Sequence, residues 1–248
     1  MKTRVLFAGI AMSFFGITNA QINVNDILNE RALGAVQKGM SGFMFSDADA
    51  AALSKQAVDK MDAENKVADA KDPYTIRLNR VFGKHKNENG LVLNYKVYLI
   101  KEVNAFATAD GSVRVFSGLM DIMDDNELLA VIGHEIGHVA NHDSRDAMKA
   151  AYQKEALIDA AASQSAKVAA VTDSQIGKIA NAILDSKHSR KQESEADLYS
   201  YDFMKRNGYN VNAVESAFNI LAKMSEGKEA SFSDKMRSSH PDAKDRPA

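Results

Sequence analysis

The feature that most constrains this chain is the pentapeptide His134-Glu135-Ile136-Gly137-His138, which lies within a stretch rich in Leu, Val and Ile. The apolar surroundings predict a buried helix from Glu127 to about Asn141. Two His residues four positions apart lie on one helical face, about one turn apart along the axis. Buried imidazoles and carboxylates without partners are costly. We therefore expect His134 and His138 to bind one metal ion, and a helix with surface His residues is the alternative.

Glu135 lies about 100° around the helix from His134, beside such an ion but not among its ligands. Zinc lowers the pKa of a bound water to ~7, and an adjacent carboxylate can accept the water's proton. The pattern therefore indicates a zinc hydrolase with Glu135 as the base. Gly133 and Gly137 lower the helix propensity of this segment. They indicate that another segment approaches this helix closely.

Two His residues leave a third ligand to be found, and the chain contains 0 Cys. The best source is Glu193-Ser194-Glu195-Ala196-Asp197, in which Glu193 and Asp197 share a helical face. We expect Glu193 to bind the metal and Asp197 to accept a hydrogen bond from the outer N–H of a ligand His. The alternative is a solvated acidic face paired with Arg190 and Lys191.

Three other His residues receive structural interpretations. His142 is too far from His134 to share its ion, and we expect it to interact with the last carbonyl groups of the helix. His85 and His188 are isolated residues in polar sequence, for which we predict no role.

The charge balance argues against a nucleic-acid partner. Lys and Arg number 31 against 33 Asp and Glu in 248 residues, a net charge of −2. Nucleic-acid-binding domains are usually basic, or carry a basic stripe.

The first twenty residues resemble an export signal. Lys2 and Arg4 are followed by apolar residues from Val5 to Ile17 and by small residues up to Ala20. That apolar run is shorter than the about 20 residues of a membrane span. We expect residues 1–20 to be a signal peptide cleaved after Ala20, with a buried first helix or an uncleaved anchor as alternatives. Residues 21–45 are of uncertain structure: a lead-in, a propeptide or a helix near the cleft.

The remaining pattern predicts an α+β fold that is mostly α with a small β-sheet. Periodicity and capping residues predict a single domain over residues 46–248, without internal repeats. Alternation predicts strands at 91–100, 104–108 and 112–116. Helices are expected at 46–66, 74–81, 127–141, 189–206 and 212–224, with one or two long helices over 144–184 that break near Thr172.

Several segments together resemble the HtpX/Oma-type family of zinc gluzincin metallopeptidases, and within it most resemble the periplasmic LoiP branch. They are the pentapeptide, Ser189–Asp197, Ser239-His240-Pro241, Asn104–Ala107 and Val115–Met120. The resemblance implies a zincin-like single catalytic domain that holds one Zn2+ per chain through His134, His138 and Glu193. It also implies that Glu135 is the base and that Asp197 orients a ligand.

The resemblance implies two further elements of the site. Asn104, Ala105, Phe106 and Ala107 would form an edge strand that pairs with an extended substrate. His240 would approach the metal, where it either stabilises the oxyanion during catalysis or occludes the zinc as a fourth ligand. The alternative is that His240 is an exposed residue in a polar tail.

These observations lead to the expectation of a zinc endopeptidase of the cell envelope that cleaves misfolded or unassembled proteins in extended conformation. Expected partners are unfolded envelope proteins and other envelope quality-control proteins. The expected location is the periplasm, either free or peripheral to the outer membrane, without a lipid anchor because Cys is absent. A chaperone-like factor with latent protease activity is the main alternative. An exopeptidase or a hydrolase of other amides would use the same residues.

Overall fold

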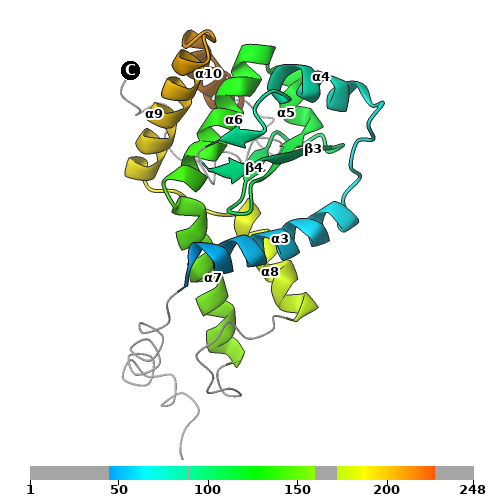
Figure 1. The fold of residues 1–248 in the computed structure, drawn as a ribbon, viewed down its shortest axis with the longest axis vertical. Helices are drawn as coiled ribbons and strands as arrows, with labels where there is room; N and C mark the ends of the chain where they lie inside the picture. Colours follow the sequence, from blue (N-terminus) through cyan, green and yellow to red (C-terminus); the bar gives the residue numbers. More distant parts are fainter. Residues whose placement is uncertain (1–44, 89, 160–171, 227–248) are drawn as a thin grey trace, which may run out of the picture. The chain divides into compact units, whose positions relative to one another are not determined.

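The computed structural model describes residues 45–88, 90–159 and 172–226. The predicted signal peptide, nearly all of the segment 21–45 and His240 lie outside these residues. The helices and strands follow the expected order and form a mostly helical α+β fold with two small sheets (Figure 1). They are α3 (Asp47–Glu64), α4 (Pro73–Phe82), β1 (Asn87–Glu88), β2 (Leu91–Val92), β3 (Asn94–Tyr98), β4 (Ala105–Ala107), β5 (Ser112–Phe116), α5 (Ser117–Ile122), α6 (Asp125–Ala140), α7 (Asp143–Asp159), α8 (Asp173–Leu184), α9 (Arg190–Arg206) and α10 (Asn212–Glu226).

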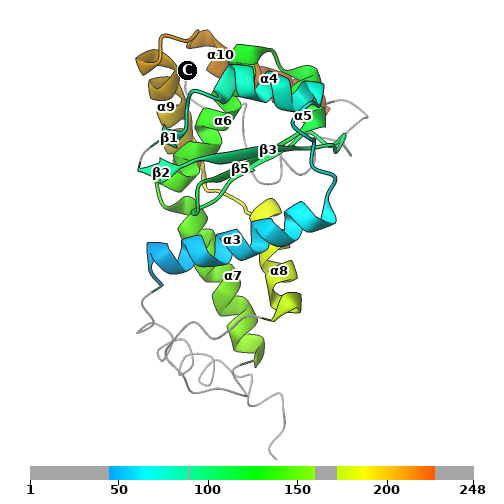
Figure 2. The ribbon, with the colours of Figure 1, turned by 45° about the vertical axis from the view of Figure 1, so that its right-hand side comes forward.

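The main sheet has the strand order β3-β5-β4, with β3 parallel and β4 antiparallel to β5. Successive side chains of a strand point to opposite faces, and the sheet accordingly separates two hydrophobic cores. On one face Ala105, Ala107 and Val115 pack in the core that includes residues of α4, α6, α9 and α10. On the other face Phe106 and Phe116 join the core that includes residues of α3, α7 and α8. Figure 2 shows the sheet with α4 on one side and α3 on the other.

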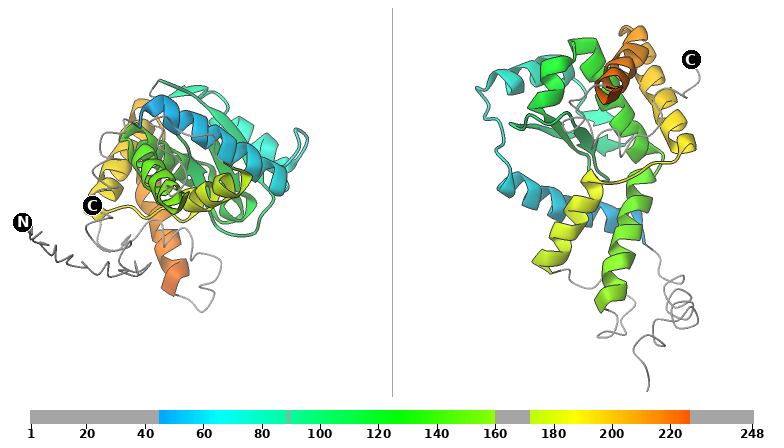
Figure 3. Two further views of the ribbon diagram at one scale, coloured as in Figure 1. Left: turned by 90° about the horizontal axis from the view of Figure 1, so that it is seen from below. Right: turned by 180° about the vertical axis from the view of Figure 1, so that it is seen from behind.

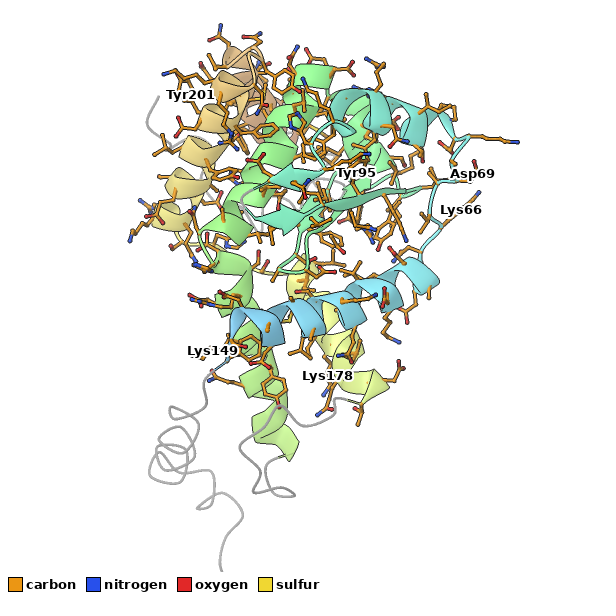
Figure 4. All side chains as sticks on the ribbon, in the orientation of Figure 1. Lys66, Asp69, Tyr95, Lys149, Lys178 and Tyr201 are labelled. Carbon is orange, nitrogen blue, oxygen red and sulfur yellow. The ribbon has the colours of Figure 1, made fainter. Side chains whose placement is uncertain are left out.

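Helices α6 and α9 lie side by side, as both views of the ribbon show (Figures 1 and 3). The close approach that the two glycines predict is made by α9. A Cβ built on Gly137 would lie 3.0 Å from Ala196 Cα, and one built on Gly133 would lie 3.1 Å from the Phe203 ring. Ser200 Oγ also donates a hydrogen bond of 2.7 Å to the Ala130 carbonyl. The opposite side of α9 carries Leu198 and Tyr201, which are exposed (Tyr201 is labelled in Figure 4).

The structure differs from the sequence prediction in the first strand. The expected strand at 91–100 is divided into β2, which pairs with β1, and β3, which pairs with β5. Alternation along the sequence cannot show that a strand changes partner, because both halves keep the same period. The expected helix break is confirmed: Thr172 is the N-cap of α8, and its hydroxyl accepts from Gln175 N–H. Within the described part of the chain, no helix is long and apolar enough to cross a membrane.

Candidate metal centre

His134 and His138 occupy successive turns of α6, and their side chains converge. The two Nε2 atoms lie 3.1 Å apart and the imidazole planes meet at 86°. Both residues are buried, because α9 and α10 cover this face of α6. The Phe218 ring of α10 packs against His134 with 4.9 Å between ring centroids. The helix thus presents two imidazoles to one point inside the protein.

Helix α9 brings a carboxylate to the same point. Glu193 is 1% exposed, and its oxygens lie 3.7 Å from His134 Nε2 and 3.5 Å from His138 Nε2. The solvated-face alternative does not hold for this residue. Lys191 instead pairs with Glu195 at 3.6 Å on the exposed side of α9. His134, His138 and Glu193 together form a group of ligand atoms close enough to hold one ion.

The outer nitrogens of both imidazoles contact carboxylates. His134 Nδ1 lies 2.9 Å from Asp197 Oδ1, as expected from the spacing of Asp197. His138 Nδ1 lies 2.9 Å from Asp143 Oδ2, a partner that the sequence analysis did not identify. An ionised carboxylate only accepts hydrogen bonds, so Nδ1 is the donor in each contact; in a neutral imidazole this leaves the lone pair on Nε2.

These donors fit a divalent cation. Two lone pairs and a buried carboxylate that face each other without a cation would repel. Two nitrogens bound to one zinc ion at ~2.0–2.1 Å with tetrahedral angles lie roughly 3.3 Å apart, close to the 3.1 Å separation here. The histidines and the glutamate are the ligand types that zinc accepts.

Glu135 opens onto a cleft next to this site. The cleft has a volume of about 600 Å3, part of it open to solvent. One wall is the edge strand β4 with its flanks, from Asn104 to Thr108, and Glu135 and His138 also line the cleft. The structure therefore brings the four predicted strand residues and the predicted base to one cavity.

Helices α7 and α8 supply an apolar side of the same cleft. Their lining residues are mostly small or aliphatic; Met148 and Ile179 are buried, and the others are only partly buried. They are Ala147, Met148, Ala151, Ile179, Ala182, Ile183 and Leu184.

Two histidines have different surroundings from those predicted. His188 lines the cleft, and its ring stacks on His138 with 3.8 Å between centroids and 14° between planes. His85 is buried among aromatic rings and forms a 2.7 Å hydrogen bond with Tyr209 Oη. Burial, with Lys84 and Arg206 nearby, lowers the pKa of His85. Both contacts are made by residues far along the chain, so neighbouring sequence carries no signal for them.

His142 corrects a third prediction. It lies beyond the end of α6, and its backbone N–H, not its ring, donates to the Val139 carbonyl. The ring lies 3.6 Å from the exposed carboxylate of Asp47.

Comparison with known proteins agrees with this geometry. Residues 77–248 match the model of Peptidase family M48. The chain is 39% identical to Metalloprotease YcaL of Escherichia coli over 99% of this chain and 95% of that protein. It is 38% identical to Metalloprotease LoiP of the same organism, over 94% and 91% of the two chains. A Protease HtpX from Xanthomonas euvesicatoria is 32% identical over 56% of this chain and 46% of its own length.

The family match covers the pentapeptide, both helices of the candidate metal centre and the edge strand of the sheet. Near-complete alignment with two metalloproteases agrees with a buried pair of imidazoles, a buried glutamate and a cleft beside them. The chain therefore belongs to peptidase family M48 and is a metalloprotease.

Proposed function

We propose that this metalloprotease is a zinc-dependent endopeptidase that cleaves polypeptides in extended conformation. The observation that carries the proposal is the convergence of His134, His138 and Glu193 beside a cleft that also contains Glu135 and an edge strand. A closed structural site would need neither a neighbouring carboxylate nor a cleft.

In the proposed mechanism His134, His138 and Glu193 would hold the ion, and Asp197 keeps the His134 ring in place through Nδ1. Zinc in such a site would polarise the scissile carbonyl and lower the pKa of the attacking water. Glu135 accepts the proton of that water as it attacks the carbonyl carbon, and then transfers the proton to the leaving amine. For His240 we propose one of two roles: it either stabilises the oxyanion or occludes the metal site.

The hydrogen-bond pattern of β4 supports pairing with a substrate strand. Thr108 N–H donates to Ser112 O, and Phe116 N–H donates to Asn104 O. The even-numbered residues of this segment therefore direct their backbone N–H and C=O groups toward β5. In an antiparallel pair the intervening residues direct their backbone groups the other way. Ala107 therefore offers its N–H and C=O on the outer side of β4, where an extended peptide would add as a further strand.

The test is digestion of an unfolded protein by the wild type and by Glu135→Gln, with zinc content measured on both. We expect cleavage by the wild type and a loss of at least 100-fold in the variant, because removal of a general base typically costs 10²–10⁴-fold. Zinc content should be equal, since Glu135 is not proposed as a ligand.

Two results would contradict the proposal. Retained activity in Glu135→Gln with bound zinc would exclude Glu135 as the base. Zinc bound in full without cleavage by the wild type would favour the chaperone-like alternative with latent activity. Mass analysis of the products separates internal cleavage from removal of terminal residues.

We also propose export to the periplasm and action on misfolded or unassembled envelope proteins. The proposal rests on the N-terminal pattern of basic, apolar and small residues up to Ala20. Cell fractionation with N-terminal sequencing tests it. Recovery of the intact chain from the cytoplasm would contradict it.

A further inference from the structure

The His138 ring is held by two groups from other parts of the chain, Asp143 and His188. Its Nδ1 contacts Asp143 Oδ2 at 2.9 Å, and Asp143 is only 6% exposed. His188, just before α9, stacks on the ring. The contact with Asp143 is the counterpart of the one between His134 and Asp197. Both imidazoles of the proposed metal site thus have a buried or partly buried carboxylate behind them.

An unusual backbone conformation places Asp143 there. Helix α6 ends at Ala140, and α7 begins at Asp143. Between them His142 has φ 65°, the left-handed region, which is uncommon for residues other than glycine. In this conformation the Cβ of an L-residue lies too close to the following carbonyl oxygen, so the conformation is unfavourable. It makes the turn between the helices that brings Asp143 back against His138.

Asp143 also joins the two helices that carry the proposed ligands. Gln192 Nε2 donates to Asp143 Oδ1 at 2.8 Å, so each oxygen of Asp143 has a different partner. Gln192 Oε1 accepts from the Ser189 backbone N–H at 2.8 Å, completing the capping box of α9. Gln192 is followed in the chain by Glu193. A continuous path of hydrogen bonds thus runs from His138 to the residue before the third ligand.

We propose that Asp143 is a positioning residue. It fixes the His138 ring with Nε2 toward the metal and, through Gln192, sets the position of the first turn of α9 and hence of Glu193. The inference rests on the proposed zinc site and adds a second orienting carboxylate to it. Carboxylates that hold the outer nitrogen of a ligand His typically change metal affinity by 10–100-fold when they are removed.

The experiment compares Asp143→Asn with Asp146→Asn, an exposed residue of the same helical turn. Zinc affinity is measured by competition with a chromophoric chelator, and the visible spectrum of the Co2+-substituted protein reports ligand geometry. Urea unfolding of the metal-free proteins reports stability. We expect Asp143→Asn to bind zinc 10–100-fold more weakly and to change the Co2+ spectrum. Asp146→Asn should match the wild type in both.

A second pair of variants tests the path through Gln192, even where Asp143→Asn does not fold. Gln192→Ala and Ser189→Ala each remove part of the capping box of α9, but only Gln192→Ala removes a hydrogen bond from Asp143. We expect Gln192→Ala to weaken zinc binding several-fold more than Ser189→Ala does, at a similar loss of stability.

The outcomes distinguish this inference from the proposed function. Zinc affinity within twofold of the wild type in Asp143→Asn and in Gln192→Ala would overturn the positioning role while the zinc protease remains. Equal losses of zinc affinity in Gln192→Ala and Ser189→Ala would show that Gln192 acts only by capping α9, and would overturn the role of its hydrogen bond to Asp143. A wild type that binds no zinc would overturn both proposals.

Discussion

Gly133 and Gly137 lie in α6 where α9 crosses it. At Gly137 the groups that would meet a Cβ include the Ala196 carbonyl oxygen at 3.1 Å, which is backbone and cannot rotate away. Glu193, the third residue of the candidate metal centre, is carried by the same helix, one turn before Ala196. The missing side chain at Gly137 therefore allows Glu193 to approach the two histidines.

We predict that Gly137→Ala destabilises the metal-free protein by up to about 2 kcal/mol, because overpacking costs about 1–3 kcal/mol and the gain in helix propensity offsets only about 1 kcal/mol of it. It should also weaken zinc binding, since α9 must move outward. Gly177→Ala in α8 is the matched control, because its Cβ would meet only Lys60 Cε at 3.3 Å. That side chain can move, so we expect stabilisation of up to about 1 kcal/mol. Urea unfolding of both variants measures whether the free energy of unfolding rises or falls. Stabilisation by both would show that α9 does not constrain Gly137.

At the scale of whole elements, α3 is joined to the sheet by a partly buried polar network. Asp62 of α3 accepts hydrogen bonds from Arg114 of β5 and from Lys96 and Tyr98 of β3. Burial alone would raise the pKa of Asp62, but these hydrogen bonds, with that from Arg114 the strongest, lower it to about 2. Burial and the hydrogen bond to Asp62 raise the pKa of Tyr98. The network fixes α3 over the face of the sheet opposite α4.

The lowered pKa of Asp62 predicts the pH dependence of stability. The folded pKa of about 2 lies below the ordinary 3.8, so ionised Asp62 stabilises the folded state by roughly 2 kcal/mol above pH 4. That contribution falls as the pH drops toward 2, and roughly half should be lost by pH 3. Asp62→Asn should therefore be destabilised by about 3 kcal/mol at pH 7, since Arg114 stays buried, and by less at pH 3.

Urea unfolding of the metal-free proteins at both pH values measures this difference. The control is Asp59→Asn, which removes an exposed ion pair with Lys55 and should leave stability nearly unchanged, because water screens exposed pairs. A difference between wild type and Asp62→Asn that is independent of pH would contradict the proposed role of the carboxylate charge.

At the scale of the whole molecule, the cleft is assembled from segments that are distant in sequence. Ser54 of α3, the strand β4, Glu135 of α6 and residues of α7 and α8 all line it. The side built by α7 and α8 is apolar and partly exposed, next to Glu135. Apolar surface that stays accessible beside a reactive carboxylate favours substrates that bury an apolar side chain there.

We predict that cleavage sites carry an apolar residue beside the scissile bond. Ala182→Glu, which places a charge on the apolar side, should lower kcat/KM at least tenfold for such peptides and much less for peptides with Lys at that position. Its neighbour Asn181 is exposed and does not line the cleft, so Asn181→Glu is the control. Mass spectrometry of digests of an unfolded protein maps the preference. Cleavage sites without apolar enrichment, together with an unaffected Ala182→Glu, would contradict it.

The sequence alone determined the elements and groups that depend on local spacing. The sequence predicted the shared helical face of His134 and His138 and that of Glu193 and Asp197, because residues three or four apart meet on a helix. It also predicted where α3 and α9 begin and a helix break near Thr172. The two glycines predicted a close neighbour but did not identify α9.

Only the tertiary structure decided which segments meet. Asp143 is five residues after His138, so no regular helix brings the two together, and their contact depends on the left-handed conformation of His142. His188 reaches the His138 ring, and His85 the Tyr209 hydroxyl, through packing between elements far apart in the chain. Spacing along the sequence determines the contacts within one helix, whereas contacts between elements follow from how their buried faces pack.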